Sequence, residues 1–243
     1  IHFSTGSNTA RSSSNFYALN NGIATLFEIR GVGIGKTSFK RRINSGLAVG
    51  FSFLKTAYEN SNFIFNQIDI ANTYTNDIVL QHERSIYTDV IKAIDIESNE
   101  LIDFSTTMHS SKDSYAISKR DRPLAYIIKK NNYGFIEKLN DVGVNYVELE
   151  KDTMIYSGGY KVVEFNNKFK VYEKMKMQKV VTSIEYSNNK FSKGDILISM
   201  NQKRSNLIAE LLEPEAPNSY VSFGIIKTSL NNQLPIYRIK NFN

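Results

Sequence analysis

The chain has 243 residues, 41% hydrophobic and 22% charged, a balance that is typical of one large or two small folded domains and excludes a disordered chain. It contains no cysteine, which excludes disulfides, thiolate zinc ligands and a cysteine nucleophile. The formal net charge is +6, but the basic residues are scattered among many acidic ones, so no nucleic-acid partner is expected, and no apolar run approaches the ~20 residues of a membrane-spanning helix.

The first 62 residues predict irregular chain, one strand and one long helix. Residues 1–22 are rich in Ser, Asn, Gly and Thr and are expected to be irregular. Residues 23–30 form an apolar run that predicts a buried strand. A helix is expected from an N-cap at Thr37 or Ser38 to about Glu59, before Asn60. Its apolar stripe is expected to pack on a core and consists of Phe39, Ile43, Leu47, Phe51, Leu54 and Tyr58.

The rest of the chain is dominated by strand-like segments. Strands are expected at residues 62–70, 77–81, 90–96, 101–105, 122–128, 145–149, 195–200, 219–226 and 234–239. Helices are expected at 133–142 and 205–212, and residues 153–172 and 178–187 are β-rich, with Gly158-Gly159 as a turn. This texture predicts one domain over residues 1–62 and a second over 63–243, with a further division near residue 120.

Glu28 is the one carboxylate inside the apolar run of residues 23–30. Burying a carboxylate is costly unless a charge, a hydrogen bond or a metal compensates for the lost water. Glu28 is therefore either paired structurally, with Arg30 as a candidate, or placed for proton transfer. The residue pattern leaves both interpretations open.

Residues 31–37 (GVGIGKT) follow the expected strand and precede the helix, as a phosphate-binding loop does. The spacing does not match. A P-loop needs Gly where Arg30 stands, and a dinucleotide fingerprint needs Gly where Lys36 stands. Glu28 in front of the loop would also repel phosphate. Nucleotide binding is therefore the weakest of the functions considered.

The three histidines are His2, His82 and His109, and none of them opens an H-x-x-E or H-E-x-x-H pattern. A catalytic zinc needs three nitrogen or oxygen ligands and an open position. No metal ligand is therefore assigned within this chain. His2 is the best placed, because it precedes the segment that carries Glu28. No G-x-S-x-G sequence is present to indicate a nucleophilic serine.

Several segments resemble the carboxypeptidase A-like zinc carboxypeptidases. Residues 4–6 (STG), 15–21 (NFYALNN), 26–35 (LFEIRGVGIG) and 39–42 (FKRR) are similar to the C-terminal part of the catalytic domain. Residues 122–128 (RPLAYII), 211–217 (LLEPEAP) and 235–238 (PIYR) are similar to the accessory C-terminal region of bacterial members. The resemblance thus extends over most of the chain.

The resemblance implies an α/β fold, the C-terminal part of a mixed-sheet catalytic domain, followed by a β-rich α+β accessory region. It places Glu28 as the general base that takes a proton from zinc-bound water. Arg30 matches the Arg that follows this Glu, and the resemblance implies a role for it in substrate binding. The loop of residues 3–6 resembles one that presents a substrate-contacting Tyr, and Phe3 is the aromatic residue nearest to that position.

The family's zinc ligands and carboxylate-binding residues precede the Glu motif, and this chain has no H-x-x-E. Together with the start at Ile1, this favours a C-terminal fragment that is inactive alone. For the intact protein we expect zinc, a peptide or peptide-like substrate, and a periplasmic or extracellular location. The alternative is a degenerate binding module for a peptide, a glycan or a protein partner. An H-x-x-E upstream in the same reading frame would favour the enzyme.

Overall fold

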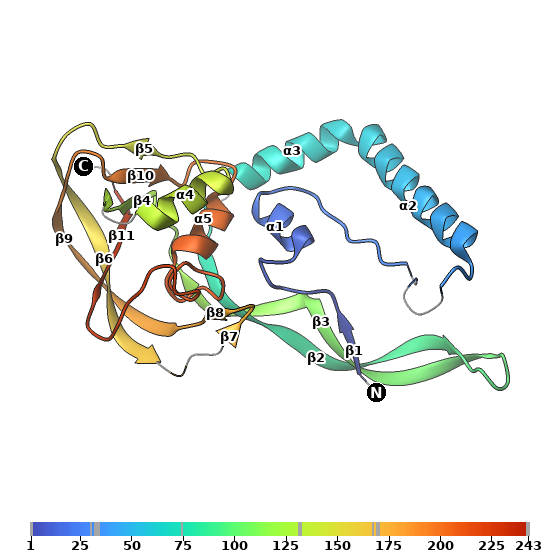
Figure 1. Cartoon of the computed structure of the whole chain (residues 1–243). Helices are drawn as coiled ribbons and strands as arrows, with labels where there is room; N and C mark the ends of the chain where they lie inside the picture. Colours follow the sequence, from blue (N-terminus) through green and yellow to red (C-terminus); the bar gives the residue numbers. More distant parts are fainter. Residues whose placement is uncertain are drawn as a thin grey trace.

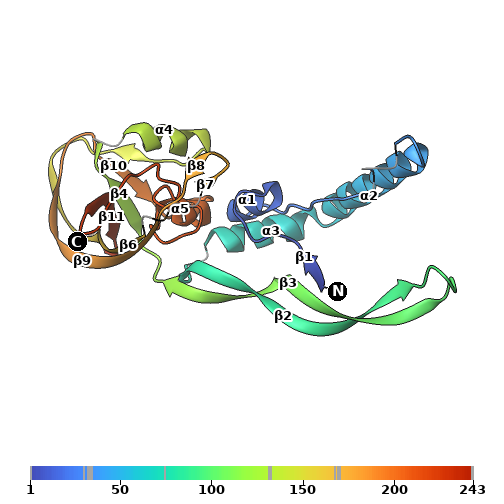
Figure 2. The same ribbon diagram turned by 60° about the horizontal axis from the view of Figure 1, so that its bottom comes forward.

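The computed structural model of the chain describes residues 2–29, 31, 35–73, 75–130, 133–166, 168 and 171–241. A C-terminal lobe, formed by residues 122–241, contains nearly all of the buried apolar side chains. A pair of long helices and a long β-hairpin project from this lobe toward the same side of the molecule (Figures 1 and 2). This mixture of helices and several sheets confirms the expected fold class, an α/β arrangement with a β-rich region.

The lobe is built on a six-stranded sheet in which every described neighbour pair is antiparallel. Its strand order is β5 (Val147–Glu148), β10 (Ile196–Ser199), β4 (Ala125–Ile128), β11 (Gln233–Ile239), β6 (Thr153–Asn166) and β9 (Lys179–Phe191). A small ribbon of β7 (Val171–Tyr172) and β8 (Met175–Lys176) lies beside it.

Both faces of this sheet are covered, because β4 alternates between two apolar clusters. Tyr126 and Ile128 belong to the larger cluster, which includes the apolar residues of α4 (Tyr133–Asp141) and α5 (Ser205–Leu212). Ala125 and Ile127 belong to the smaller cluster, with Phe191 and Tyr237. Burial on both faces explains the continuous apolar sequence of this short strand. The predicted positions of β4, β10, β11, α4 and α5 are confirmed within a few residues.

The projecting hairpin, here called the arm, consists of β2 (Ile78–Ile94) and β3 (Leu101–Arg120). Residues Ile78 and Leu80 at its base are buried in the core of the lobe, whereas most of its remaining side chains are exposed or half-buried. The strand β1 (His2–Thr5) adds to the arm by pairing in parallel with residues 107–110 of β3. The arm and β1 together form a three-stranded sheet, and the arm is anchored to the lobe at its base.

Three helices lie outside the lobe: α1 (Ser13–Leu19), α2 (Phe39–Glu59) and α3 (Ser61–Asn72). The prediction of α2 is confirmed, with Ser38 at the N-cap and Asn60 at the C-cap, although the Ser38 side chain makes no capping hydrogen bond. Residue Ser38 has a positive φ of 57°, so its hydroxyl is not aimed at the first turn.

Four other predictions of local structure are wrong. Residues 1–22 are not irregular throughout, because they contain β1 and α1. The strand β1 pairs with β3, which is far along the chain. The helix α1 is capped by Ser12 Oγ, which accepts a hydrogen bond from Asn15 N at 3.5 Å. Residues 62–70 lie in α3, because no described strand is beside them to pair with and a helix satisfies its own backbone. Residues 219–226 form turns, in which the hydroxyl of Ser219 donates to Pro214 O at 3.0 Å.

The fourth wrong prediction is the turn at Gly158-Gly159, which lies in the middle of β6 and pairs with β9. A Cβ at position 158 would lie 2.7 Å from Ile184 Cγ2, and one at position 159 would lie 2.5 Å from Gln233 Nε2. These glycines allow neighbouring side chains to cross close to the strand, which is the usual reason for glycine inside a sheet.

The apolar stripe of α2 is exposed, contrary to the prediction that it packs on a core. Neither α2 nor α3 contains a buried residue, and the exposed fractions of Leu47, Phe51 and Leu54 are 53%, 68% and 65%. In the described part of the chain, no helix or strand covers this stripe. The spacing of apolar residues therefore predicted the helix correctly, but not its burial. None of the described helices is long and apolar enough to cross a membrane.

We expect the chain to self-associate through this stripe, because contiguous exposed apolar patches of this kind are interaction surfaces. Replacing Leu47 and Leu54 together by Lys is expected to shift the chain toward monomer in sedimentation velocity at micromolar concentration. The matched control is Ile96→Lys, since Ile96 is 95% exposed between the two strands of the arm, away from the stripe. A wild-type chain that stays monomeric over the same concentrations would contradict this prediction.

Candidate active site

The segment that carries Glu28 lies along α2. Phe27 packs edge-on against Phe53 with 5.8 Å between ring centroids, and a Cβ at Gly46 would lie 3.5 Å from Ile29 Cδ1. Arg42 Nη1 donates to Gly31 O at 3.3 Å, and its Nη2 donates to Gly35 O at 2.7 Å. The segment therefore runs antiparallel to α2, and Arg42 holds the chain where it turns into the helix.

The prediction that residues 23–30 form a buried strand is wrong for the described residues 23–29, which belong to no strand. A strand needs backbone partners on a neighbouring strand, and the described chain places none beside this segment. Glu28 is exposed, and no described residue forms a hydrogen bond or an ion pair with it. Arg30 lies outside the described residues. The catalytic role of Glu28 stays a prediction.

The loop resembling the substrate-contacting loop lies on the arm. Phe3 is opposite Met108 of β3 and is 44% exposed. His2 and His109 come together on these two strands, with 5.3 Å between their ring centroids. His82 lies on β2. The described residues include no group of three or more His, Cys, Asp or Glu that could hold a metal ion, so they do not form a zinc site.

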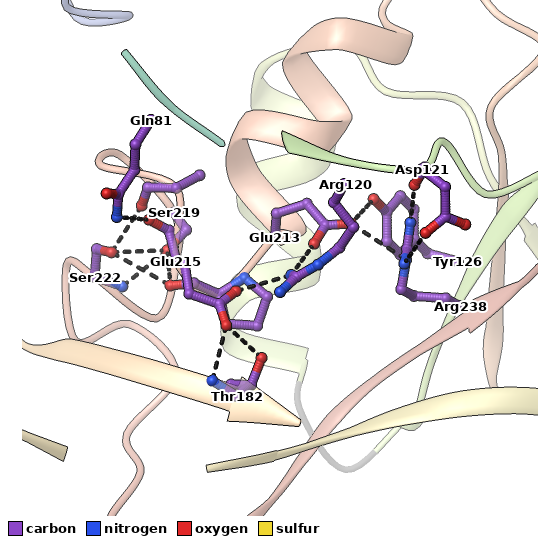
Figure 3. A network of polar contacts seen from close by, with 12 residues as sticks. Gln81, Arg120, Asp121, Tyr126, Thr182, Glu213, Glu215, Ser219, Ser222 and Arg238 are labelled. Atoms are coloured by element: carbon purple, nitrogen blue, oxygen red, sulfur yellow. Dashed lines mark hydrogen bonds and ion pairs between the residues drawn. The ribbon is translucent and has the colours of Figure 1, made fainter. Parts of the chain in front are cut away.

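A buried ionic network lies in the lobe and was not predicted from the sequence (Figure 3). The fully buried Glu213 follows α5 and accepts hydrogen bonds from Arg120 Nη1 at 2.6 Å and Tyr126 OH at 2.5 Å. The guanidinium Nε of Arg238, also fully buried, lies 3.4 Å from Glu213 Oε1. Two arginines thus surround one buried carboxylate, and the network connects β3, β4, β11 and the residues after α5.

A second carboxylate, Glu215, completes the network. It accepts from Arg120 Nη1 at 2.8 Å and from both Thr182 N at 2.8 Å and Thr182 Oγ1 at 2.5 Å. Burial by itself raises the pKa of Glu215, but the hydrogen bond and charge of Arg120 and the Thr182 donors outweigh it and lower that pKa. Burial likewise lowers the pKa of Arg120, and its hydrogen bond to Glu215 and the nearby charges of Glu213 and Glu215 reverse the shift and raise it.

The depressed pKa of Glu215 predicts an acid-labile lobe. Because the folded-state pKa lies below the ordinary value of 4.5, the stabilisation is fully present above pH 4.5 and is lost as the pH falls through the folded-state pKa. Urea unfolding at several pH values is expected to show a steeper loss of stability below pH 4.5 for wild type than for Glu215→Gln. Equal slopes for the two proteins would contradict the prediction.

The network is structural in character, because its carboxylates are already satisfied and little of it reaches solvent. Its residues lie far apart in sequence, at positions 120, 126, 182, 213, 215 and 238. The available sequence signal was residues 213–217 (EPEAP), where two acids alternate with prolines after a helix. The sequence does not indicate which arginines would meet these acids.

Comparison with known proteins gives one consistent result. The chain is 30% identical over 240 residues to carboxypeptidase 2 of Trichophyton equinum, 29% over 240 residues to that of Trichophyton rubrum and 28% over 235 residues to that of Trichophyton tonsurans. Each alignment covers 95% of this chain and 44% of the relative, so the chain spans less than half the length of these relatives. No family model and no solved structure matches the chain. The chain is thus similar, over nearly its whole length, to part of proteins named carboxypeptidase 2.

Proposed function

We propose that this chain is the C-terminal part of a carboxypeptidase-like hydrolase that removes residues from the carboxyl end of peptides. The observation that carries the proposal is the similarity of 95% of the chain to proteins named carboxypeptidase 2. Because the chain spans 44% of those relatives, the remaining parts of the site are assigned to sequence outside this chain. In this proposal Glu28 is the general base, and Phe3 and Arg30 are assigned to substrate binding.

The exposed α2 stripe supports this assignment. Its residues have the spacing of a helix that packs on a core, yet they are exposed together with Leu26, Phe27 and Ile29 of the Glu28 segment. A further part of a catalytic domain would cover the stripe and supply the strands that residues 23–29 lack. Glu28 would then be desolvated, as a general base that works near neutral pH needs to be.

Zinc belongs to this proposal as the metal of the longer protein. The described residues do not fit a zinc site, so the ligands of the zinc ion are assigned to the longer protein. The chain alone is therefore expected to lack peptidase activity. A periplasmic or extracellular location is part of the same proposal and is to be tested by localising the longer protein.

The test is to express the longer reading frame beside this 243-residue chain. Both proteins are assayed for zinc content and for release of the last residue from a peptide with a free carboxyl terminus, and the same peptide with an amidated terminus is the control. We expect zinc and hydrolysis of the free peptide in the longer protein alone. Absence of zinc and hydrolysis from the folded longer protein would overturn the proposal.

A further inference from the structure

A cavity of about 980 Å³ lies where three parts of the molecule meet. Its walls come from the loop of residues 5–11, from the base of the arm and from the lobe, including Glu210 and Phe223. The volume is at the upper end of the range for pockets that bind small ligands. Neither Glu28 nor Phe3 lines the cavity, although Thr5 and Gly6 of the loop that carries Phe3 do.

The regular pairing of the arm is interrupted at this cavity. Glu83 pairs with Tyr115 and Ser85 pairs with Ser110, so Arg84 on β2 lies opposite the four residues 111–114 of β3. Bulges of this kind redirect side chains and are common beside functional sites. Here the bulge brings Arg84, Ser111 and Lys112 to the cavity wall, with Arg84 Nη2 donating to Gly6 O at 3.3 Å.

The cavity wall has an excess of positive charge. Among the described residues, Arg84 and Lys112 form no ion pair, whereas Arg11 is paired with Glu173 at 3.4 Å and lies 3.9 Å from the ring centroid of Tyr172. The Oγ atom of Ser111 is buried and has no hydrogen-bond partner in the described part of the chain. Two free cations and an unused hydroxyl on one bulge are what a negatively charged ligand requires.

The acidic groups near the cavity are already occupied. Glu210 accepts from Asn218 N at 3.1 Å and from Asn218 Nδ2 at 2.7 Å. Asp113 lies in the bulge but does not line the cavity, and it accepts from Ser110 Oγ at 2.7 Å. Both carboxylates thus bond to neutral donors, and among the described residues neither forms an ion pair with Arg84 or Lys112.

The rest of the lining is largely apolar, with Leu19, Leu80, Met177 and Phe223 among its residues. An apolar wall beside two cations suits a ligand that has carboxylates next to apolar groups. Asn8, Asn15 and Asn218 also line the cavity, but their Nδ2 groups already donate within the chain, to Ser114, to Ser7 O and Thr9 O, and to Glu210.

We propose that this cavity binds an acidic peptide segment in which carboxylates alternate with apolar side chains. The carboxylates would contact Arg84, Lys112 and Ser111, and the apolar side chains would contact Leu19, Leu80 and Phe223. This proposal does not depend on hydrolysis, because the residues named for binding all belong to this chain.

The test uses the 243-residue chain and a fluorescein-labelled hexapeptide in which Glu alternates with Leu, with binding measured by fluorescence anisotropy. The same peptide with Gln in place of Glu is the matched ligand control. Arg84→Gln and Lys112→Gln are each expected to weaken binding of the Glu peptide by about tenfold, the effect of losing a charge-assisted hydrogen bond. Lys112 is exposed, so its replacement tests the charge without disturbing the fold.

The matched protein control is Arg41→Gln, which removes the same charge from an exposed position on α2. It is expected to leave binding of the Glu peptide unchanged. Equal affinity for the Glu and Gln peptides, or full affinity in both cavity variants, would overturn the proposal. Citrate that competes as strongly as the peptide would identify a small-anion site and would overturn the peptide assignment.

Discussion

Replacing Glu213 by Leu is expected to lower the free energy of unfolding by about 3–5 kcal/mol, the usual cost of breaking a buried ion pair by removing one partner. Glu213 is fully buried, and its carboxylate contacts Arg120, Arg238 and Tyr126. Leu removes the negative charge but leaves the Arg238 guanidinium, itself fully buried, without that partner. Of the described ion pairs, Arg238 would keep the one with the half-exposed Asp121, at 3.4 Å between Nη1 and Oδ1, and Arg120 would keep the one with Glu215.

Urea unfolding followed by circular dichroism measures this loss. The control is Glu97→Leu, because Glu97 is exposed between the two strands of the arm and its replacement is expected to change stability by less than about 0.5 kcal/mol. A Glu213→Leu protein as stable as wild type would show that the network does not hold the lobe together.

Replacing Glu28 by Gln in the longer protein is expected to lower kcat by about 10²–10⁴, the usual contribution of a general base. Gln has nearly the same shape as Glu but cannot accept a proton at neutral pH, so substrate binding is expected to change little. Steady-state hydrolysis of a peptide with a free carboxyl terminus gives kcat and KM separately.

The control for Glu28→Gln is Glu59→Gln, which makes the same exchange at an exposed site on α2 where Glu59 pairs with Lys55 at 3.8 Å. This protein is expected to keep wild-type kcat. A Glu28→Gln protein with wild-type kcat would remove Glu28 from the mechanism. A protein that loses binding as well as turnover would indicate that Glu28 is a structural residue, the second interpretation that the sequence leaves open.

Local sequence signals predicted the helices and the short core strands of the lobe. The spacing of apolar residues predicted α2, α4 and α5, and runs of β-branched and aromatic residues predicted β4, β10 and β11. The same signals were wrong at residues 23–29, 62–70 and 219–226, where three β-like segments lack a described strand partner. An apolar or β-branched segment becomes a strand only when another strand is beside it, and that depends on parts of the chain distant in sequence.

The sequence by itself determined the fold class, the position of the long helix and the similarity to carboxypeptidases. Tertiary structure alone decided which charges meet. It brought Arg120 and Arg238 to Glu213 across about ninety and twenty-five residues of chain, and it placed Arg84 and Lys112 together on a bulge. These contacts depend on strand register and on the path of β3 into the lobe, which long-range pairing sets and residue spacing does not encode.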